Sequence, residues 1–302
     1  MQYRKPMPEF LYTAAQVPAL QRLKDVGMHC GCQYTDLPVF RGLAPYSRFD
    51  HSLGVARILW DFTEDPQQAL TGLFHDAATP VFSHVVDFLN GDHLTQESTE
   101  EGLQTILKNH GIAAVPSRYP LADCPSPRLC ADRLEYTLSN GIHYDFCADV
   151  QKMYDDLTVG VNEDGVEELV FTSPQTALDF AEMALACGKV YVCDEDRYAM
   201  ERLSRILRKA LEENIITRQD LYTTEPQVIE KLPAEDWQRF CRLKRVFRVD
   251  IPGEFSYRVP AKKRCIDPLI ADQGRVSEIF PEFKEQVEEF LCCSQDYCIC
   301  AE

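Results

Sequence analysis

Hydrophobic residues recur at helical spacing along most of this chain. In segment 51–62, HSLGVARILWDF, apolar residues fall three and four positions apart, which predicts a helix with one buried face. Segment 66–78, PQQALTGLFHDAA, repeats this pattern behind a proline suited to a first helical turn. Three further helices are predicted in the first half, at 80–89, 97–111 and 126–141. The pattern therefore favours a mainly α-helical fold.

The second half of the chain mixes helical and alternating patterns. Asp164-Gly165 joins two runs rich in β-forming residues, as in a β-hairpin. Later, alternating residues interrupted by a Pro-Gly turn indicate a second, smaller β element. The elements predicted here are a hairpin at 157–172, helices at 174–192, 194–215 and 281–293, and a small mixed region at 246–275.

The change of pattern near the hairpin suggests how the chain is organised. We expect a helical core over residues 1–155 and, over 156–302, a helical extension with a small mixed α/β C-terminal region. Neither an internal repeat nor a long Gly/Ser linker marks the junction. One continuous domain therefore stays open as the alternative, since 302 residues suffice for one large core.

Charge narrows the range of partners. The chain has 48 Asp and Glu against 31 Lys and Arg, a net charge of −17, which repels nucleic acids and anionic membranes. Neither a charged-then-apolar leader nor an apolar run of about 18 residues is found in it. We expect a cytoplasmic protein that binds neither nucleic acid nor membrane, and a homo-oligomer stays open.

Thirteen cysteines are an unusually high number for such a chain. Cys292, Cys293, Cys298 and Cys300 cluster near the end, but their spacing lacks the paired C-x2-C arms of common zinc sites. A secreted disulfide framework does not suit a chain of this length without an export signal. We interpret the thiols as reduced and without a metal role, with a C-terminal zinc site as the alternative.

Four polar residues lie in or beside the predicted helices of the first half. They are His51, the adjacent pair His75-Asp76 and Asp132. Three antiparallel helices could bring them to one point, where imidazole and carboxylate groups suit a divalent metal such as manganese, iron or zinc. Taken singly, each is more often an ordinary core or surface residue. Periodicity alone does not show that the three helices meet.

The segments that carry these residues resemble a known family. YSRFDHSLGVARI, then LTGLFHDAATPVFSHVVDFL, then CADRLEYTL are similar to the HD-domain metal-dependent phosphohydrolases. The resemblance is strongest to the branch of deoxynucleoside triphosphate triphosphohydrolases and covers about half of the chain. It implies an HD-domain helical bundle, in which the pattern at 157–172 is a β-hairpin insertion.

The resemblance also implies a role for each matching residue. His51, His75, Asp76 and Asp132 match the ligands of a divalent ion, whether Mn, Fe, Zn, Ni or Mg. The other matches line the substrate: Arg48 and Arg133 contact phosphate, His84 lines the phosphate site as a catalytic group, and Tyr136 lies in the substrate pocket. Arg48 is expected to touch the phosphate and not the ion. Without the motif, both arginines would be surface salt-bridge residues.

The chain departs from the family pattern at several positions. Thr79 stands where the branch commonly has a histidine. A downstream His-Glu pair is replaced by Gln96-Glu97, with His93 three positions away, and an Arg-Asp pair by Ser139-Asn140. Neither threonine nor glutamine shuttles a proton at neutral pH. These differences weaken the expectation of triphosphate release but leave the four ligands in place.

Two functions from different classes follow from the sequence. The first is an enzyme that hydrolyses a phosphate ester of a nucleotide or related small metabolite, with metal-activated water. The second is a catalytically weakened HD-domain protein that binds a phosphorylated ligand as a sensor or regulator. The intact ligand set favours the enzyme, and the changes at Thr79 and Gln96 favour the sensor.

Overall fold

The computed structural model describes residues 2–91, 102–109, 119–250, 253 and 255–302. Within them the fold is mainly α-helical, as predicted. The helices of the first half are α1 (Glu9–Ala15), α2 (Pro18–Gln21), α3 (Arg48–Thr63), α4 (Pro66–Phe74), α5 (Val85–Leu89), α6 (Leu103–Asn109), α7 (Ala131–His143) and α8 (Gln151–Asp155). The second half contains α9 (Pro174–Val190), α10 (Asp194–Glu212), α11 (Glu225–Lys231), α12 (Ala234–Cys241), α13 (Val276–Ile279) and α14 (Pro281–Cys292).

Two small sheets accompany the helices. The predicted hairpin is confirmed: β1 (Leu157–Val161) pairs antiparallel with β2 (Glu167–Phe171). The strands β5 (Leu269–Ile270) and β6 (Gly274–Arg275) extend it in the order β1-β2-β5-β6. The second sheet is antiparallel, with β7 (Cys298–Ala301) between β3 (Val246–Val249) and β4 (Ser256–Tyr257). The mixed region predicted at 246–275 is therefore divided between two sheets.

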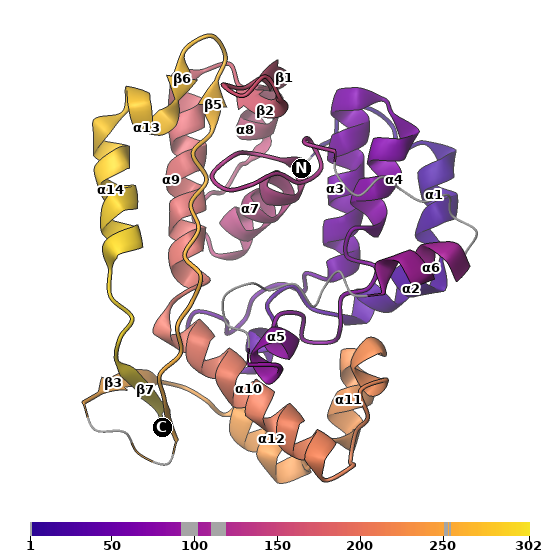
Figure 1. Ribbon diagram of the computed structural model, residues 1–302, viewed down its shortest axis with the longest axis vertical. Coiled ribbons are helices and arrows are strands. Elements are labelled where there is room, and N and C mark those ends of the chain that lie inside the picture. Colours follow the sequence, from indigo (N-terminus) through magenta and orange to yellow (C-terminus); the bar gives the residue numbers. More distant parts are fainter. Residues whose placement is uncertain (1, 92–101, 110–118, 251–252, 254) are drawn as a thin grey trace.

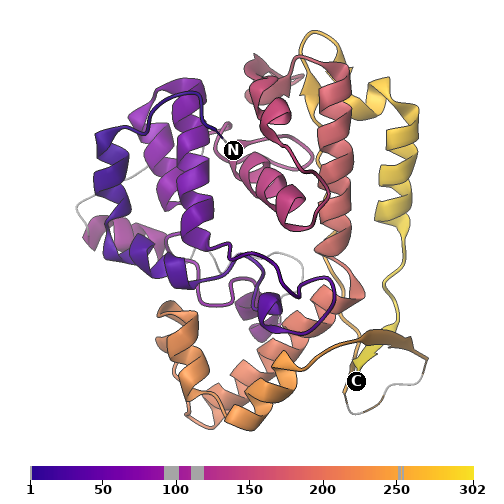
Figure 2. The ribbon, with the colours of Figure 1, turned by 180° about the vertical axis from the view of Figure 1, so that it is seen from behind.

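The helices form two groups with α7 between them. Figure 1 shows α1, α3 and α4 packed on one side of α7, and α9 and α14 on the other. The view from behind in Figure 2 shows the same order. Below these groups, α10 packs against α5 and α12. None of the described helices is long and apolar enough to cross a membrane.

Three helix boundaries differ from the sequence prediction. Helix α5 begins at Val85 and not at Pro80, because Phe82 and Ser83 have left-handed φ angles of 58° and 49° that a right-handed helix cannot contain. Helix α4 ends at Phe74, so that the turn after it begins at His75. The helix predicted at 97–111 is described from Leu103 to Asn109, and its predicted first residues lie outside the described part.

The start of α7 also differs, because this helix begins at Ala131 and not at Ser126. The Ser126 hydroxyl donates to the Cys265 carbonyl at 2.9 Å and does not cap the helix. Instead, the Ala131 amide donates to the Leu121 carbonyl at 2.8 Å. The residues before α7 are thus tied to neighbouring loops, and Asp132 falls in its first turn, where the helix dipole favours a carboxylate.

In the described part of the chain, the hydrophobic core consists of two clusters. The first extends from Leu11 to Ile299 and includes α10 residues such as Leu203. The second extends from Val55 to Phe290 and joins α7 to α9. Helix α3 contributes to both clusters, with Ala56 in the first and Val55 in the second. Each cluster therefore joins residues from both sides of residue 155.

Candidate metal centre

The first turn of α3 carries Arg48 and His51 and is held by a capping box. The Ser47 hydroxyl accepts from the Asp50 amide at 3.1 Å, and the Asp50 carboxylate accepts from the Ser47 amide at 3.2 Å. These two bonds satisfy amides that no helical carbonyl reaches. Arg48 and His51 point inward from this turn and are both buried.

The turn after α4 carries His75 and Asp76. The His75 Nδ1 lies 2.6 Å from the Gly72 carbonyl oxygen, which fixes the ring beside the helix end. The Thr79 amide donates to the Asp76 carbonyl at 2.9 Å and closes the turn. The Thr79 hydroxyl donates to Asp76 Oδ1 at 3.0 Å, so the residue in the histidine position of the family is buried and holds a carboxylate.

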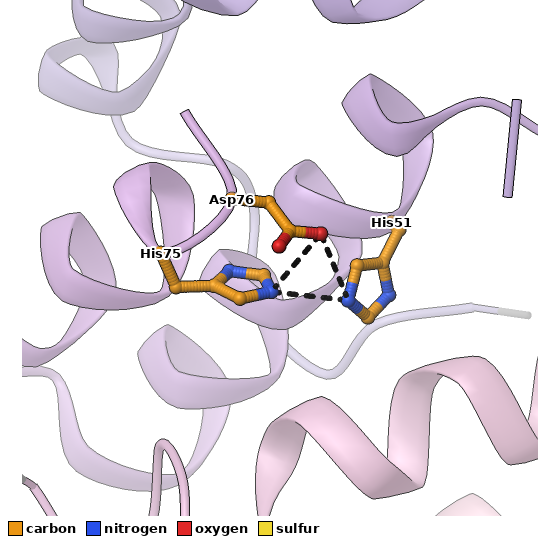
Figure 3. A group of neighbouring side chains, drawn as sticks. All are labelled: His51, His75 and Asp76. Atoms are coloured by element: carbon orange, nitrogen blue, oxygen red, sulfur yellow. Dashed lines mark hydrogen bonds and ion pairs between the residues drawn. The ribbon is translucent and has the colours of Figure 1, made fainter. Parts of the chain in front are cut away.

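The four expected ligands meet at one point between α3, α4 and α7. The Nε2 atoms of His51 and His75 are 3.1 Å apart, and Asp132 Oδ1 lies 3.0 Å from the first and 3.5 Å from the second. Asp76 Oδ2 lies 3.6 Å from His75 Nε2 and 4.0 Å from His51 Nε2. Figure 3 shows the two imidazoles and the Asp76 carboxylate pointing toward one another.

This donor set fits a divalent transition metal. The Nδ1 atom of His75 faces the Gly72 carbonyl, and the Nδ1 atom of His51 lies 2.5 Å from Glu135 Oε2. A carbonyl and a carboxylate can only accept a hydrogen bond, so each of these Nδ1 atoms carries a hydrogen. Both Nε2 lone pairs are then free to face the centre, as ligation requires. Metal–ligand bonds of about 2.0–2.2 Å place neighbouring donors roughly 3–3.6 Å apart, close to the separations seen here.

The electrostatics of the group favour added positive charge. Burial opposes a charge on His51, but its hydrogen bonds to Asp132 and Glu135 outweigh burial and raise its pKa to about 10. Burial likewise opposes charge on Asp132, yet the two histidines hold the pKa of its carboxyl well below the usual range. In the metal-free protein, a proton on His51 would therefore compensate the carboxylates in place of a dication.

Arg48 contacts one of the expected ligands directly. Its Nη1 donates to Asp76 Oδ2 at 2.7 Å and its Nε to the Ser83 hydroxyl at 3.0 Å. Despite burial, this guanidinium is the main cause that lowers the pKa of Asp76. The expectation that Arg48 touches phosphate and not the ion stays a prediction, because Asp76 is an expected ligand and not the ion itself.

The remaining predicted site residues lie at different places around the centre. The Tyr136 ring is 6.4 Å from the His51 ring, centroid to centroid, beside the ligands. Arg133 donates to the Arg128 carbonyl at 2.9 Å and contacts the Cys124 thiol at 3.3 Å. His84 Nδ1 pairs with Asp87 Oδ2 at 3.1 Å, and a quarter of the His84 side chain is exposed. In the described part of the chain, no hydrogen bond or ion pair joins His84 or Arg133 to the four ligands.

The positions that depart from the family pattern have structural partners where they are described. Ser139 donates to Glu135 Oε1 at 2.8 Å, and the Asn140 amide donates to the Tyr191 hydroxyl at 2.7 Å. His93, Gln96 and Glu97 lie outside the described residues.

Two residues of the centre were not predicted from the sequence. Glu135, a buried carboxylate, binds the far nitrogen of His51, and Tyr46 binds Glu135. Helical spacing could have indicated Glu135, because Glu135 follows Asp132 by three residues and therefore lies on the same helix face. Tyr46 precedes α3 in a loop, where no periodicity indicates its direction.

The cysteines can be placed relative to the metal centre. All thirteen are free thiols. Among the described residues, none of the C-terminal cysteines joins a group of potential metal donors. Asp123, Cys130 and Asp132 do cluster, but the Arg133 guanidinium, 3.9 Å from both Asp123 Oδ1 and Cys130 Sγ, already supplies positive charge there.

Comparison with known proteins connects this centre to named relatives. No protein-family model matches the chain. An uncharacterized Bacillus subtilis protein, YdhJ, is 27% identical over 252 residues, 74% of each chain. The metal-dependent phosphohydrolase cns2 of Cordyceps militaris is 24% identical over 309 residues, covering 91% of this chain and 86% of its own.

Two solved structures share the fold over nearly the whole chain. A hypothetical protein from Aquifex aeolicus superposes with a TM-score of 0.62 at 17% identity, covering 98% of this chain and 93% of its own. A phosphohydrolase from Bacteroides thetaiotaomicron gives a TM-score of 0.61 at 16% identity, covering 99% and 97%.

Proposed function

We propose that this protein is a metal-dependent phosphohydrolase of the HD type, with a divalent ion held by His51, His75, Asp76 and Asp132. The observation that carries this proposal is the convergence of two imidazole Nε2 atoms and two carboxylates from three helices. The relative from Cordyceps militaris, aligned over 91% of this chain, bears the name of that activity.

The residues of the centre divide into holding and reacting groups. His51, His75, Asp76 and Asp132 would hold a divalent ion, which would activate water near neutral pH and polarise a phosphoryl oxygen. Arg48 and Thr79 orient Asp76 from opposite sides, through Oδ2 and Oδ1. His84, partly exposed and oriented by Asp87, is the group we assign to protonate the leaving oxygen.

The substrate we propose is a small phosphorylated metabolite of the nucleotide class. Tyr136 lies half-buried beside His51, and its ring meets the Tyr191 ring edge-on at 6.1 Å. Aromatic side chains at such a place suit the flat ring of a nucleoside. Because Thr79 is turned to Asp76, it supplies no proton to a substrate, and we expect phosphatase or phosphodiesterase activity to exceed release of triphosphate.

A ligand-binding sensor is the second candidate, and one observation favours it. Both cations expected to hold phosphate are engaged with protein partners: Arg48 with Asp76, and Arg133 with the Arg128 carbonyl. A pocket with few free cations would bind a phosphate but stabilise its transition state weakly.

A metal-dependent assay separates the two. The purified protein is treated with chelator, reloaded with Mn²⁺, and assayed with nucleoside mono-, di- and triphosphates and phosphodiesters, with products identified by chromatography. We expect turnover that requires metal and is lost in Asp76→Ala, but is kept in Asp296→Ala, which removes an exposed carboxylate paired with Arg258. Stoichiometric release of triphosphate would contradict the proposed reaction, and binding without turnover would support the sensor.

A further inference from the structure

Glu135 is a carboxylate beside the centre that accepts hydrogen bonds from three side chains. It lies on α7, three residues after Asp132, and is buried. Three donors converge on it: His51 Nδ1 and the Tyr46 hydroxyl, each 2.5 Å from Oε2, and the Ser139 hydroxyl, 2.8 Å from Oε1. A buried carboxylate is costly unless it is bonded in this way.

A glycine creates the space for this carboxylate. Gly54 follows His51 by three residues on α3, so the two share a helix face. A Cβ atom at Gly54 would lie 2.6 Å from Glu135 Cγ and 2.8 Å from Oε1, closer than real side chains approach. Any larger residue at position 54 would therefore push Glu135 away from His51.

Tyr46 is itself fixed in position. Its ring stacks on the His143 ring at 5.0 Å with an angle of 23° between the planes, and it is buried. Because the ring is held in this way, the Tyr46 hydroxyl is directed at the Glu135 carboxylate. Residues from the loop before α3, from α3 and from α7 thus converge on a single carboxylate.

We infer that Glu135 is a positioning residue of the metal centre, which fixes the ring and the tautomer of His51 and increases the donor strength of its Nε2, with Tyr46 and Gly54 as its supports. This inference rests on the proposed metal ligands. A carboxylate behind a ligating imidazole orients the ring and makes it a stronger ligand. Within the described residues, His75 Nδ1 meets the neutral Gly72 carbonyl and not a carboxylate, so this effect is expected at His51 and not at His75.

Metal affinity measured on a set of variants tests the inference. Chelator-treated proteins are titrated with Co²⁺ in competition with a chromophoric chelator. Glu135→Ala should weaken binding by about 10–100-fold, the usual effect of removing such a partner. Glu135→Gln should weaken it less, because the amide oxygen can still accept from His51 and Tyr46 while the charge is lost. Gly54→Ala should resemble Glu135→Ala, and Tyr46→Phe should resemble Glu135→Gln.

Two controls separate this role from general destabilisation. Glu168→Gln alters another buried carboxylate, bonded to Arg275 at 2.6 Å in the hairpin sheet. Gly141→Ala adds a methyl group to another helical glycine, where it meets the flexible Met183 side chain. Both controls should lower the unfolding temperature while leaving the Co²⁺ affinity within about twofold of the unaltered protein.

Proton NMR of the Co²⁺-loaded protein gives a second readout. Two paramagnetically shifted, exchangeable signals are expected, from Nδ1–H of His51 and of His75. Glu135→Ala should remove or broaden only one, because the His75 partner is unchanged. If Glu135→Ala does not fold, Glu135→Gln and Tyr46→Phe keep the packing and carry the test.

The outcomes distinguish this inference from the proposed function. Unchanged affinity in the Glu135 and Gly54 variants, with both signals kept, overturns the role of Glu135 while the metal centre stands. If Asp76→Ala binds Co²⁺ as tightly as the unaltered protein, the ligand assignment itself is wrong. Losses of affinity in the controls equal to those in Glu135→Ala would show a merely structural role.

Discussion

Arg48 shows how one side chain couples the charge of the centre to the stability of the fold. It is buried, and its guanidinium is shared between Asp76 and the hydroxyl of Ser83. Ser83 is held at a left-handed φ of 49°. The unusual turn before α5 is therefore linked to a metal ligand through one arginine, and changing the arginine leaves a buried carboxylate without its cation.

Replacement of Arg48 by methionine should destabilise the metal-free protein by about 3–5 kcal/mol, since it breaks a buried ion pair. Adding Mn²⁺ should recover part of this loss, because a bound ion compensates Asp76 and stabilises the folded state. Urea denaturation in chelator measures the loss of stability, and urea denaturation with Mn²⁺ measures how much of it is recovered. A variant as stable as the parent in chelator would show that the pair contributes little.

The protonation of His51 determines how metal binding depends on pH. Its pKa of about 10 means that the imidazole is protonated near neutral pH, whereas a ligand must be neutral. Binding therefore releases protons, and the affinity for Mn²⁺ should rise about tenfold per unit between about pH 6.5 and 8.5. Calorimetry in buffers of different ionisation enthalpy counts the protons. An affinity independent of pH would contradict this.

The raised pKa of His51 affects the stability of the metal-free protein in the opposite direction: this stability falls as the pH rises, whereas the metal affinity increases. The pKa of His51 is higher in the folded chain than its ordinary 6.5, so the folded state binds the proton more tightly. Its contribution to stability is complete below about pH 6.5 and is lost as the pH rises through about 10. At alkaline pH, a bound ion should therefore add most to the stability of the protein.

At the scale of elements, the start of α3 determines where the centre lies. The capping box of Ser47 and Asp50 fixes the turn that carries Arg48 and His51. Helix α9 provides a natural comparison, because its N-cap, Ser173, forms no side-chain capping bond. Both serines stand at the N-cap position of a helix, but of the two only the Ser47 side chain forms a capping hydrogen bond.

Ser47→Ala should therefore cost about 0.5–2 kcal/mol of stability, the usual value for a lost N-cap. Ser173→Ala should change stability by less than about 0.5 kcal/mol, as for a surface substitution without a specific partner. Thermal and urea denaturation of both variants measure the difference. Equal effects would mean that the capping box contributes nothing beyond the serine itself.

Periodicity predicted elements well and their ends poorly. The helices at α3, α9 and α10 and the hairpin follow from apolar spacing and from Asp164-Gly165, because these signals are local. The start of α7 does not, because Ser126 finds a tertiary acceptor in the Cys265 carbonyl. Of the expected ligands, His51 lies on the well-predicted α3, and His75 directly follows α4. Tyr46, in contrast, acts from a loop whose course only packing decides.

At the scale of the whole molecule, each half of the chain completes the core of the other. The first cluster loses Tyr198, Leu203 and Leu207 of α10 if the chain is cut at residue 155. The second loses Phe180 of α9, which packs with residues of α7. Neither half retains a complete core, although all four expected ligands lie in the first.

A fragment of residues 1–155 should therefore fail to fold cooperatively, despite containing the whole ligand set. Circular dichroism should show reduced helix and no sharp thermal transition, whereas the full chain should unfold in one transition. Co²⁺ titration of the fragment should show no site comparable to that of the full chain. A fragment that melts sharply and binds Co²⁺ would restore the boundary at 155.

The packing of α3 against both clusters also affects how fast this helix opens. Val55 is held by one cluster and Ala56 by the other, so the helix cannot swing away from either without disrupting both. Its amide hydrogens should then exchange with solvent only during global opening, which is the slowest class of exchange. His51, in the first turn of α3, would therefore keep its place in the centre until the whole molecule opens, and heat would inactivate and unfold the protein together.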